Sequence, residues 1–196
     1  MSTSPNSPLP PVVVAAARGE LPDWAVASPP RREHMGRVAA LLAEWAEALE
    51  LPEPERARWA AVGWLHDALR DAPPEELRGE VPPGFRHLPG PALHGPAAAQ
   101  RLEGIVDDEM LQAIRYHTIG HPSLERLGTA LYLADFLEPG RDFAIDWRAS
   151  LAARMPREMN GVLLEVLGAR LQHLVQERKT IRPETAAFWS AAVQRP

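Results

Sequence analysis

The apolar residues of this chain recur at the spacing of an α-helix, and this periodicity constrains the fold more than any other feature of the sequence. Val38, Leu41, Leu42, Trp45 and Leu49, for example, share one face of a helix. No segment shows the strict alternation of apolar and polar residues that is typical of a half-buried strand. The sequence therefore predicts an all-α fold.

Prolines and glycines divide this pattern into separate helices. We expect helices at about residues 30–50, 55–69, 94–103, 107–117, 123–137 and 146–177, the last with a break at Pro156, and a short helix after Pro183. Residues 1–29 are rich in proline and predict a loose tail with one short helix. We expect residues 30–196 to form one domain, in which residues 79–91 are a loop that overhangs a pocket.

Composition excludes several classes of function. The 196 residues carry a formal net charge of −5, so the chain lacks the basic surface that nucleic-acid binding usually requires. It has no cysteine, which excludes disulfides, thiolate metal sites and a cysteine nucleophile. The apolar stretch from Val12 to Ala17 is too short to cross a membrane. We therefore expect a cytoplasmic protein in which any metal is held by nitrogen and oxygen.

Histidines and aspartates stand on the apolar faces of five of the expected helical segments. His34 shares its face with Val38, and Asp135 shares its face with Leu131. A buried carboxylate is costly unless it is paired or binds a metal. A single buried histidine is more often a hydrogen-bonded core residue, and a single aspartate often caps a helix or pairs with arginine. Six such groups together favour a divalent metal site, with the ligands His34, His66, Asp67, His94, His117 and Asp135.

The residues around these groups resemble the HD-domain metal-dependent phosphohydrolase superfamily, and more narrowly its bacterial branch of symmetrical bis(5'-nucleosyl)-tetraphosphatases. The resemblance covers about residues 30 to 190. It implies a helical bundle with a metal site between the central helices. The matching segments are Arg31–His34, Trp64–Asp67, Leu93–Pro96, Ala113–Thr118 and Leu131–Arg141.

The resemblance also implies a role for each of the six groups. His34, His66, Asp67 and Asp135 would bind one metal ion, and Asp67 would bridge to a second ion held by His94 and His117. Asp67 and His66 are then the expected catalytic residues. The cofactors would be two divalent ions, with iron expected first and manganese, cobalt, nickel or zinc as alternatives.

The activity implied by the family is the symmetrical hydrolysis of diadenosine tetraphosphate to two ADP, by a hydroxide that two metal ions activate. The partner is thus a nucleotide substrate, and neither nucleic acid nor a membrane is expected; a homodimer is left open. Two alternatives keep the fold. One is hydrolysis of another nucleotide, such as a nucleoside phosphate or a cyclic nucleotide, and the other is a nucleotide-sensing module without turnover.

Four residues are the expected contacts of the polyphosphate, and they depart in part from the family pattern. Arg70 stands where the family commonly has lysine, and His121 stands where it has arginine. Met35 and Arg37 likewise replace a threonine and a glycine. Each expected contact has the alternative of being a solvated or helix-capping charge. The four are Arg70, Arg115, His121 and Arg141.

Overall fold

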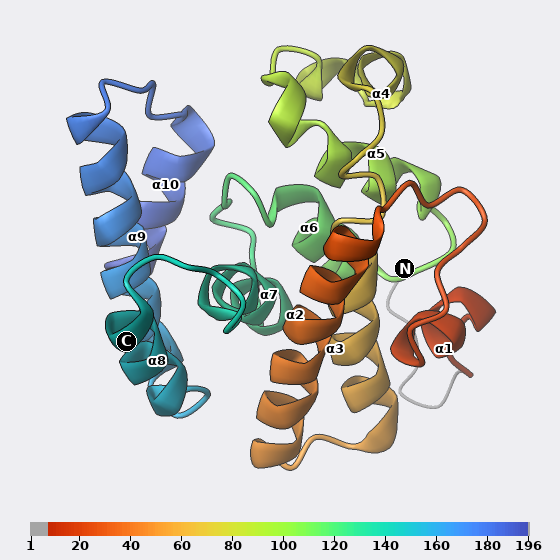
Figure 1. Cartoon of the computed structure of the whole chain (residues 1–196), viewed down its shortest axis with the longest axis horizontal. Helices are drawn as coiled ribbons and strands as arrows, with labels where there is room; N and C mark the ends of the chain where they lie inside the picture. Colours follow the sequence, from red (N-terminus) through yellow and green to blue (C-terminus); the bar gives the residue numbers. More distant parts are fainter. Residues whose placement is uncertain (1–7, 196) are drawn as a thin grey trace.

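The structure, a computed structural model, describes residues 8–195, and over that range the regular elements are all helical (Figure 1). The predicted all-α fold is confirmed. The α-helices are α1 (Pro11–Ala17), α2 (Pro29–Ala48), α3 (Glu53–Leu65), α4 (Pro74–Glu80), α5 (His94–Arg101), α6 (Asp108–Tyr116), α7 (Arg126–Leu137), α8 (Ile145–Arg154), α9 (Met159–Gln176) and α10 (Pro183–Ala192). Two short 3₁₀ turns, Pro83–Phe85 and Gly90–Ala92, precede α5.

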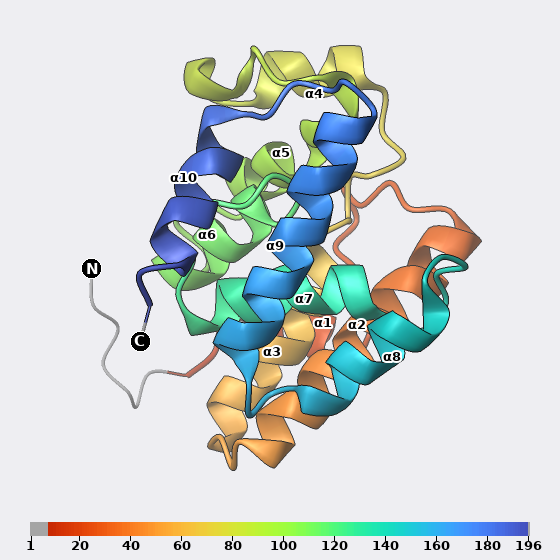
Figure 2. The ribbon, with the colours of Figure 1, turned by 90° about the vertical axis from the view of Figure 1, so that its left-hand side faces the viewer.

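Helix α7 is the centre of the bundle. It contacts α2, α3 and α6 on one side and α8 and α9 on the other, an arrangement visible in Figures 1 and 2. Nine of its twelve residues are buried, from Leu127 to Leu137, as expected for a helix that is apolar all round. Asp135 is therefore carried by a helix that is buried over most of its length, and its own side chain is partly buried. Among the described residues, no helix is both long and apolar enough to span a membrane.

Helices α2 and α3 form a closely packed hairpin because Gly63 lacks a side chain. A Cβ atom at Gly63 would lie 2.5 Å from Cα and 2.8 Å from the backbone nitrogen of Ala39. The two backbones are thus too close together for a methyl group to fit between them. His34, near the start of α2, and His66, directly after α3, lie at the same end of this hairpin. The contact between Gly63 and Ala39 is close to that end, so it influences how closely the two imidazoles can approach.

The N-terminal segment is packed where it is described. Helix α1 contacts α3, and Val13 and Ala16 are fully buried in the same core. Trp64 of α3 covers Gly19 just beyond this helix. The short helix predicted within residues 1–29 is α1. It is packed and not loose, because its apolar face is buried by α3. Residues 1–7 lie outside the described part, and a domain boundary at residue 30 stays a prediction.

The segment between α3 and α5 is more regular than expected. The sequence predicts no helix between residues 69 and 94, yet Pro74 begins α4. Proline is favoured at the first position of a helix, and Glu75 and Glu76 suit the positive end of the helix dipole. Leu77 then anchors α4 in the core. The expected loop at residues 79–91 is reduced to the end of α4 and the two 3₁₀ turns.

We predict that Gly63→Ala destabilises the protein by about 1–3 kcal/mol, because the added methyl group must separate α2 from α3. Gly79→Ala is the matched control, since a Cβ at that helical position meets no atom within 4 Å; we expect it to be neutral or to stabilise by up to about 1 kcal/mol. Urea denaturation followed by circular dichroism measures both. Equal stability of the two variants would contradict the close approach.

Candidate metal centre

The fold brings the six predicted ligands to one buried place at the ends of five helices. His34 lies near the start of α2, and His66 and Asp67 directly follow α3. His94 is the first residue of α5, His117 directly follows α6, and Asp135 lies near the end of α7. The first five are between 0% and 7% exposed. Positions spread over about 100 residues of sequence are thus joined in one cluster because their helix ends meet.

Asp67 lies between two pairs of imidazoles. Its Oδ1 atom is 2.9 Å from Nε2 of His94 and 3.5 Å from Nε2 of His117. Its Oδ2 atom is 3.7 Å from Nε2 of both His34 and His66. Two ligand groups result, His34–His66–Asp67 and Asp67–His94–His117, and in each the ligand atoms lie within 4.8 Å of one another. A carboxylate shared between two such groups has the arrangement of a bridging ligand.

The ring orientation of three histidines is set by the backbone. Nδ1 of His66 donates to the carbonyl of Gly63 at 2.8 Å, and Nδ1 of His117 donates to that of Ile114 at 2.8 Å. His94 repeats the pattern with Pro91 at 2.9 Å. A carbonyl oxygen only accepts, so the proton of each neutral ring is on Nδ1 and the lone pair is on Nε2. This is the second-shell contact by which metal-binding imidazoles are oriented.

The Nε2 lone pairs of these histidines face one another, and too few hydrogen-bond donors lie between them to satisfy every lone pair. Nε2 of His94 and Nε2 of His117 are 3.0 Å apart. The Thr118 hydroxyl lies 3.0 Å from the second and 3.4 Å from the first, but it can donate its single proton to only one of them. Nε2 of His34 and of His66 is buried with no hydrogen-bond partner among the described residues. Facing lone pairs require an electrophile, so this donor set fits divalent metal ions.

Electrostatics keep Asp67, His66 and His94 in the protonation states that bind metal. Burial raises the pKa of Asp67, but the adjacent imidazoles of His66, His117 and His94 outweigh burial, and the pKa of Asp67 is held well below its usual range. Burial lowers the pKa of His66 to about 4 and also lowers that of His94. At neutral pH these three residues therefore offer one carboxylate and two neutral imidazoles.

Asp135 adds a second carboxylate on the His34 side. Its Oδ1 atom is 3.1 Å from Nε2 of His34. Burial opposes protonation of His34, but the nearby carboxylate of Asp135 outweighs burial and raises the pKa of His34. A positive charge between these two donors is thus favourable, as it would be for a metal ion held by both.

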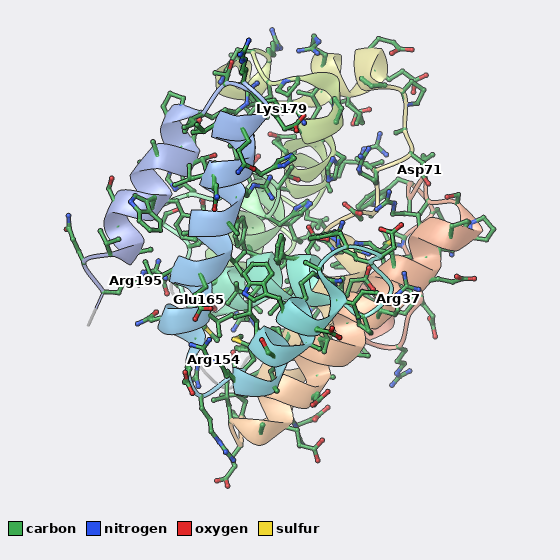
Figure 3. All side chains as sticks on the ribbon, turned by 60° about the vertical axis from the view of Figure 1, so that its left-hand side comes forward. Arg37, Asp71, Arg154, Glu165, Lys179 and Arg195 are labelled. Atoms are coloured by element: carbon green, nitrogen blue, oxygen red, sulfur yellow. The ribbon has the colours of Figure 1, made fainter. Side chains whose placement is uncertain are left out.

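Two residues beside the centre were not assigned a role from the sequence. Glu138 accepts from Nδ1 of His34 at 3.2 Å and from Nε of Arg37 at 2.6 Å; Figure 3 shows Arg37 next to the segment that joins α7 to α8. Arg31 donates to Oδ2 of Asp67 at 2.7 Å. Arg31 lies in the matching segment Arg31–His34, and Glu138 lies in Leu131–Arg141. Their positions in these segments are the sequence feature from which a role in the centre could have been predicted.

The four expected phosphate contacts are distributed unequally. Arg141 donates to Oδ1 of Asp135 at 2.5 Å. Arg70 follows Asp67 by three residues. The pKa of His94 is lowered mainly by burial, and the positive charge of Arg70 lowers it further. Arg115 lies 5.9 Å from the ring centre of Phe85, and its Nε is buried without a hydrogen-bond partner in the described part of the chain.

His121 lies in different surroundings. It stacks on Tyr116 with ring centres 4.1 Å apart, and its Nδ1 atom contacts the Ser123 hydroxyl at 2.6 Å. The groove that His121 lines is acidic, because Asp108, Glu109 and Glu125 also line it, and none of the six candidate ligands does. These surroundings repel a polyphosphate. Arg141 and Arg70 act on residues of the centre, whereas Arg115 is linked to His121 through Phe85 and Tyr116.

Comparisons with known proteins agree with this geometry. The HD domain family model matches residues 31–140, which contain all six candidate ligands. A relative from Bacillus subtilis (strain 168) is 32% identical over 152 residues, which cover 70% of this chain and 79% of the relative. A relative from Halalkalibacterium halodurans is 33% identical over 101 residues, which cover 50% of this chain and 53% of the relative. Both are named bis(5'-nucleosyl)-tetraphosphatase, symmetrical.

A solved structure shares the fold. It comes from Clostridium acetobutylicum and is described as a predicted HD superfamily hydrolase involved in NAD metabolism. The two structures superpose with a TM-score of 0.74 over 86% of this chain and 92% of that one, at 21% sequence identity. The likeness shows that the two proteins share the helical arrangement seen in Figures 1 and 2.

We predict that a divalent ion such as Mn²⁺ stabilises the protein against unfolding, by about 2.7 kcal/mol at a free concentration of 100 times the dissociation constant. Asp67→Asn should lose this effect, because the shared carboxylate is replaced by a neutral amide. Asp23→Asn, at an exposed position, is the control and should keep it. Thermal unfolding with and without chelator measures the shift; an equal metal-dependent shift in both variants would argue against Asp67 as a ligand.

Glu138→Gln should weaken metal binding by about 10–100-fold, because Glu138 orients the imidazole of His34 and removal of such contacts has effects of this size. Equilibrium dialysis with Mn²⁺ measures the affinity and the number of ions bound. Glu165→Gln is a suitable control, since Glu165 pairs with Arg154 on the surface. Unchanged metal affinity in Glu138→Gln would exclude the positioning role.

Proposed function

Because the chain belongs to the HD domain family, we propose that it is a metal-dependent phosphohydrolase that splits diadenosine tetraphosphate symmetrically into two molecules of ADP. The observation that carries the proposal is Asp67, which is shared by two groups of buried ligands. The names of both relatives support the symmetrical reaction and its substrate. The net charge of −5 favours a small nucleotide over nucleic acid.

The proposed ligand sets follow the two groups. His34, His66, Asp67 and Asp135 would hold one ion, and Asp67, His94 and His117 would hold the other. When bound, two such ions supply Lewis-acid stabilisation of phosphate oxygens and an acidified water at neutral pH. Nitrogen and oxygen donors suit iron, our first expectation, as well as manganese, cobalt, nickel or zinc.

The reaction adds one water to the bond between the second and third phosphates. The oxygen of water joins one phosphorus, and the bridging oxygen leaves with the other half as ADP. Asp67 and His66 would act as ligands that fix where the attack occurs, and their burial keeps bulk water away. Arg70, Arg115 and Arg141 would offset the negative charge of the polyphosphate, which four linked phosphates make large.

We predict that the metal-reconstituted protein converts diadenosine tetraphosphate to ADP alone, and that a chelator stops the reaction. Asp67→Ala and His66→Ala should reduce turnover by at least about a thousandfold, because each removes a ligand of the reacting centre. Asp23→Ala is the matched control. Chromatographic separation of the nucleotides identifies the products.

Three outcomes separate this proposal from its alternatives. If only other nucleotides are cleaved, and the products are a nucleoside monophosphate and inorganic phosphate, the protein is a phosphohydrolase with a different substrate. Tight nucleotide binding without hydrolysis across several divalent metals would identify a sensing module. Full turnover by purified Asp67→Ala would remove the bridging role.

A further inference from the structure

We propose that a groove beside the metal centre is an anion-binding subsite that holds phosphate groups of one nucleotide half of the substrate. This inference rests on the proposed function and deepens it. The groove, called here the arginine groove, has a volume of about 200 Å³ and lies between the segment before α5, the turn after α6 and the α9–α10 connection. The residues that define it are Pro91, Thr118, Arg170, Thr180, Arg182 and Thr185.

The arginine groove adjoins the centre through two of its residues. The Thr118 hydroxyl is 3.0 Å from Nε2 of His117 and 3.4 Å from Nε2 of His94. The carbonyl of Pro91 accepts the Nδ1 hydrogen of His94 at 2.9 Å. The groove therefore adjoins the His94–His117 side of the centre, one residue away from these two imidazoles.

Two positive charges line the groove without a carboxylate partner. Nη2 of Arg170 donates to the carbonyl of Thr118 at 2.6 Å, and a guanidinium has further N–H groups to donate. Neither Arg170 nor Arg182 lies in any ion pair of residues 8–195, whereas Arg31, Arg37 and Arg141 all do. Glu184, the nearest carboxylate in sequence, is 4.0 Å from His87 and does not line the groove.

This charge arrangement favours an anion. Two guanidinium groups in one groove repel each other. An anion bound between them is attracted to both and offsets that repulsion. Guanidinium groups also recognise phosphate oxygens in a fixed, two-pronged geometry. The hydroxyl groups of Thr118 and Thr180 add donors of the kind that phosphate oxygens accept.

The size of the groove selects a part of the substrate. Pockets that bury a drug-sized ligand measure about 300–1,000 Å³, so a volume of about 200 Å³ suits a phosphate segment and not a whole nucleotide. The acidic groove at His121 repels the same segment. The polyphosphate chain is therefore expected to leave the centre past Thr118 toward Arg170 and Arg182, and not past His121.

The test compares Arg170→Gln, Arg182→Gln and the double variant with Arg157→Gln. The control removes the same charge from an exposed position just before α9. That end of α9 is marked by Arg154 and Glu165 in Figure 3, whereas Lys179 marks the end near the groove. For diadenosine tetraphosphate we expect KM to rise about 10–100-fold in the double variant at equal metal content, with kcat changed much less. In Arg182→Gln, metal content and hydrolysis of bis(p-nitrophenyl) phosphate, which is too short to reach the groove, should match the control.

A second measurement works without turnover and separates this proposal from the proposed function. Isothermal calorimetry with ADP and with inorganic triphosphate should show affinity for the metal-loaded protein reduced about 10–100-fold in the double variant. If the wild type fails to cleave diadenosine tetraphosphate but this loss is seen, the subsite stands and the substrate is wrong. Equal affinity for both ligands in the double variant and in Arg157→Gln would overturn the subsite.

Arg182→Gln guards against a purely structural explanation. Arg170 contacts the backbone of Thr118, so its loss can also shift His117 and reduce metal content. The side chain of Arg182 makes no hydrogen bond to the described residues, so its replacement leaves the centre in place. Weaker ADP binding by Arg182→Gln at normal metal content supports the subsite, and a defect confined to Arg170→Gln with loss of metal would contradict it.

Discussion

The candidate centre depends on three imidazole N–H groups, each of which donates a hydrogen bond to the backbone carbonyl three residues earlier in the chain. Gly63 and Ile114 lie in the last turns of α3 and α6, where helical carbonyls lack a partner within the helix. His66 and His117 use these carbonyls to fix their rings. Each helix thus ends by orienting a ligand, and the Nε2 atoms face Asp67 because the helix ends meet there.

The charges around this cluster are balanced one by one. Asp67 accepts from Arg31, Asp135 from Arg141, and Glu138 from Arg37. The buried carboxylates are therefore not left uncompensated, which would destabilise the fold. Arg170 and Arg182 have no such partner among residues 8–195, and they share one groove. The proposed anion subsite therefore keeps positive charge in a chain whose net charge is negative.

Helical periodicity predicted most of the fold, because α2, α3, α6 and α7 carry continuous apolar faces whose spacing is readable one helix at a time. It missed α4, since Pro73 and Pro74 mark a helix start as well as a stop, and only the burial of Leu77 decides between them. It also extended the second helix to Leu69, although the helix ends at Leu65 and the following turn carries His66 and Asp67.

The same reasoning explains which parts of the site were predictable. The six candidate ligands were predictable because six histidines and aspartates on helical segments of one chain are unusual together, although each alone is not. Glu138 lies in a matching segment, which was its only signal, and its contact with His34 is distant in sequence. Arg170 contacts Thr118, which is also distant in sequence, so no local pattern distinguishes Arg170. His121 is the opposite case, because its position in a local motif predicted contact with phosphate. The structure surrounds it with the carboxylates of Asp108, Glu109 and Glu125, which the motif does not contain.

The central claim is that Asp67 bridges two metal ions, and anomalous diffraction from a crystal of the Mn²⁺-loaded protein tests it most directly. The account predicts two peaks roughly 3.5–4 Å apart, one beside each carboxylate oxygen of Asp67, with His34 and His66 at the first and His94 and His117 at the second. A single peak, or peaks that do not touch Asp67, would contradict it.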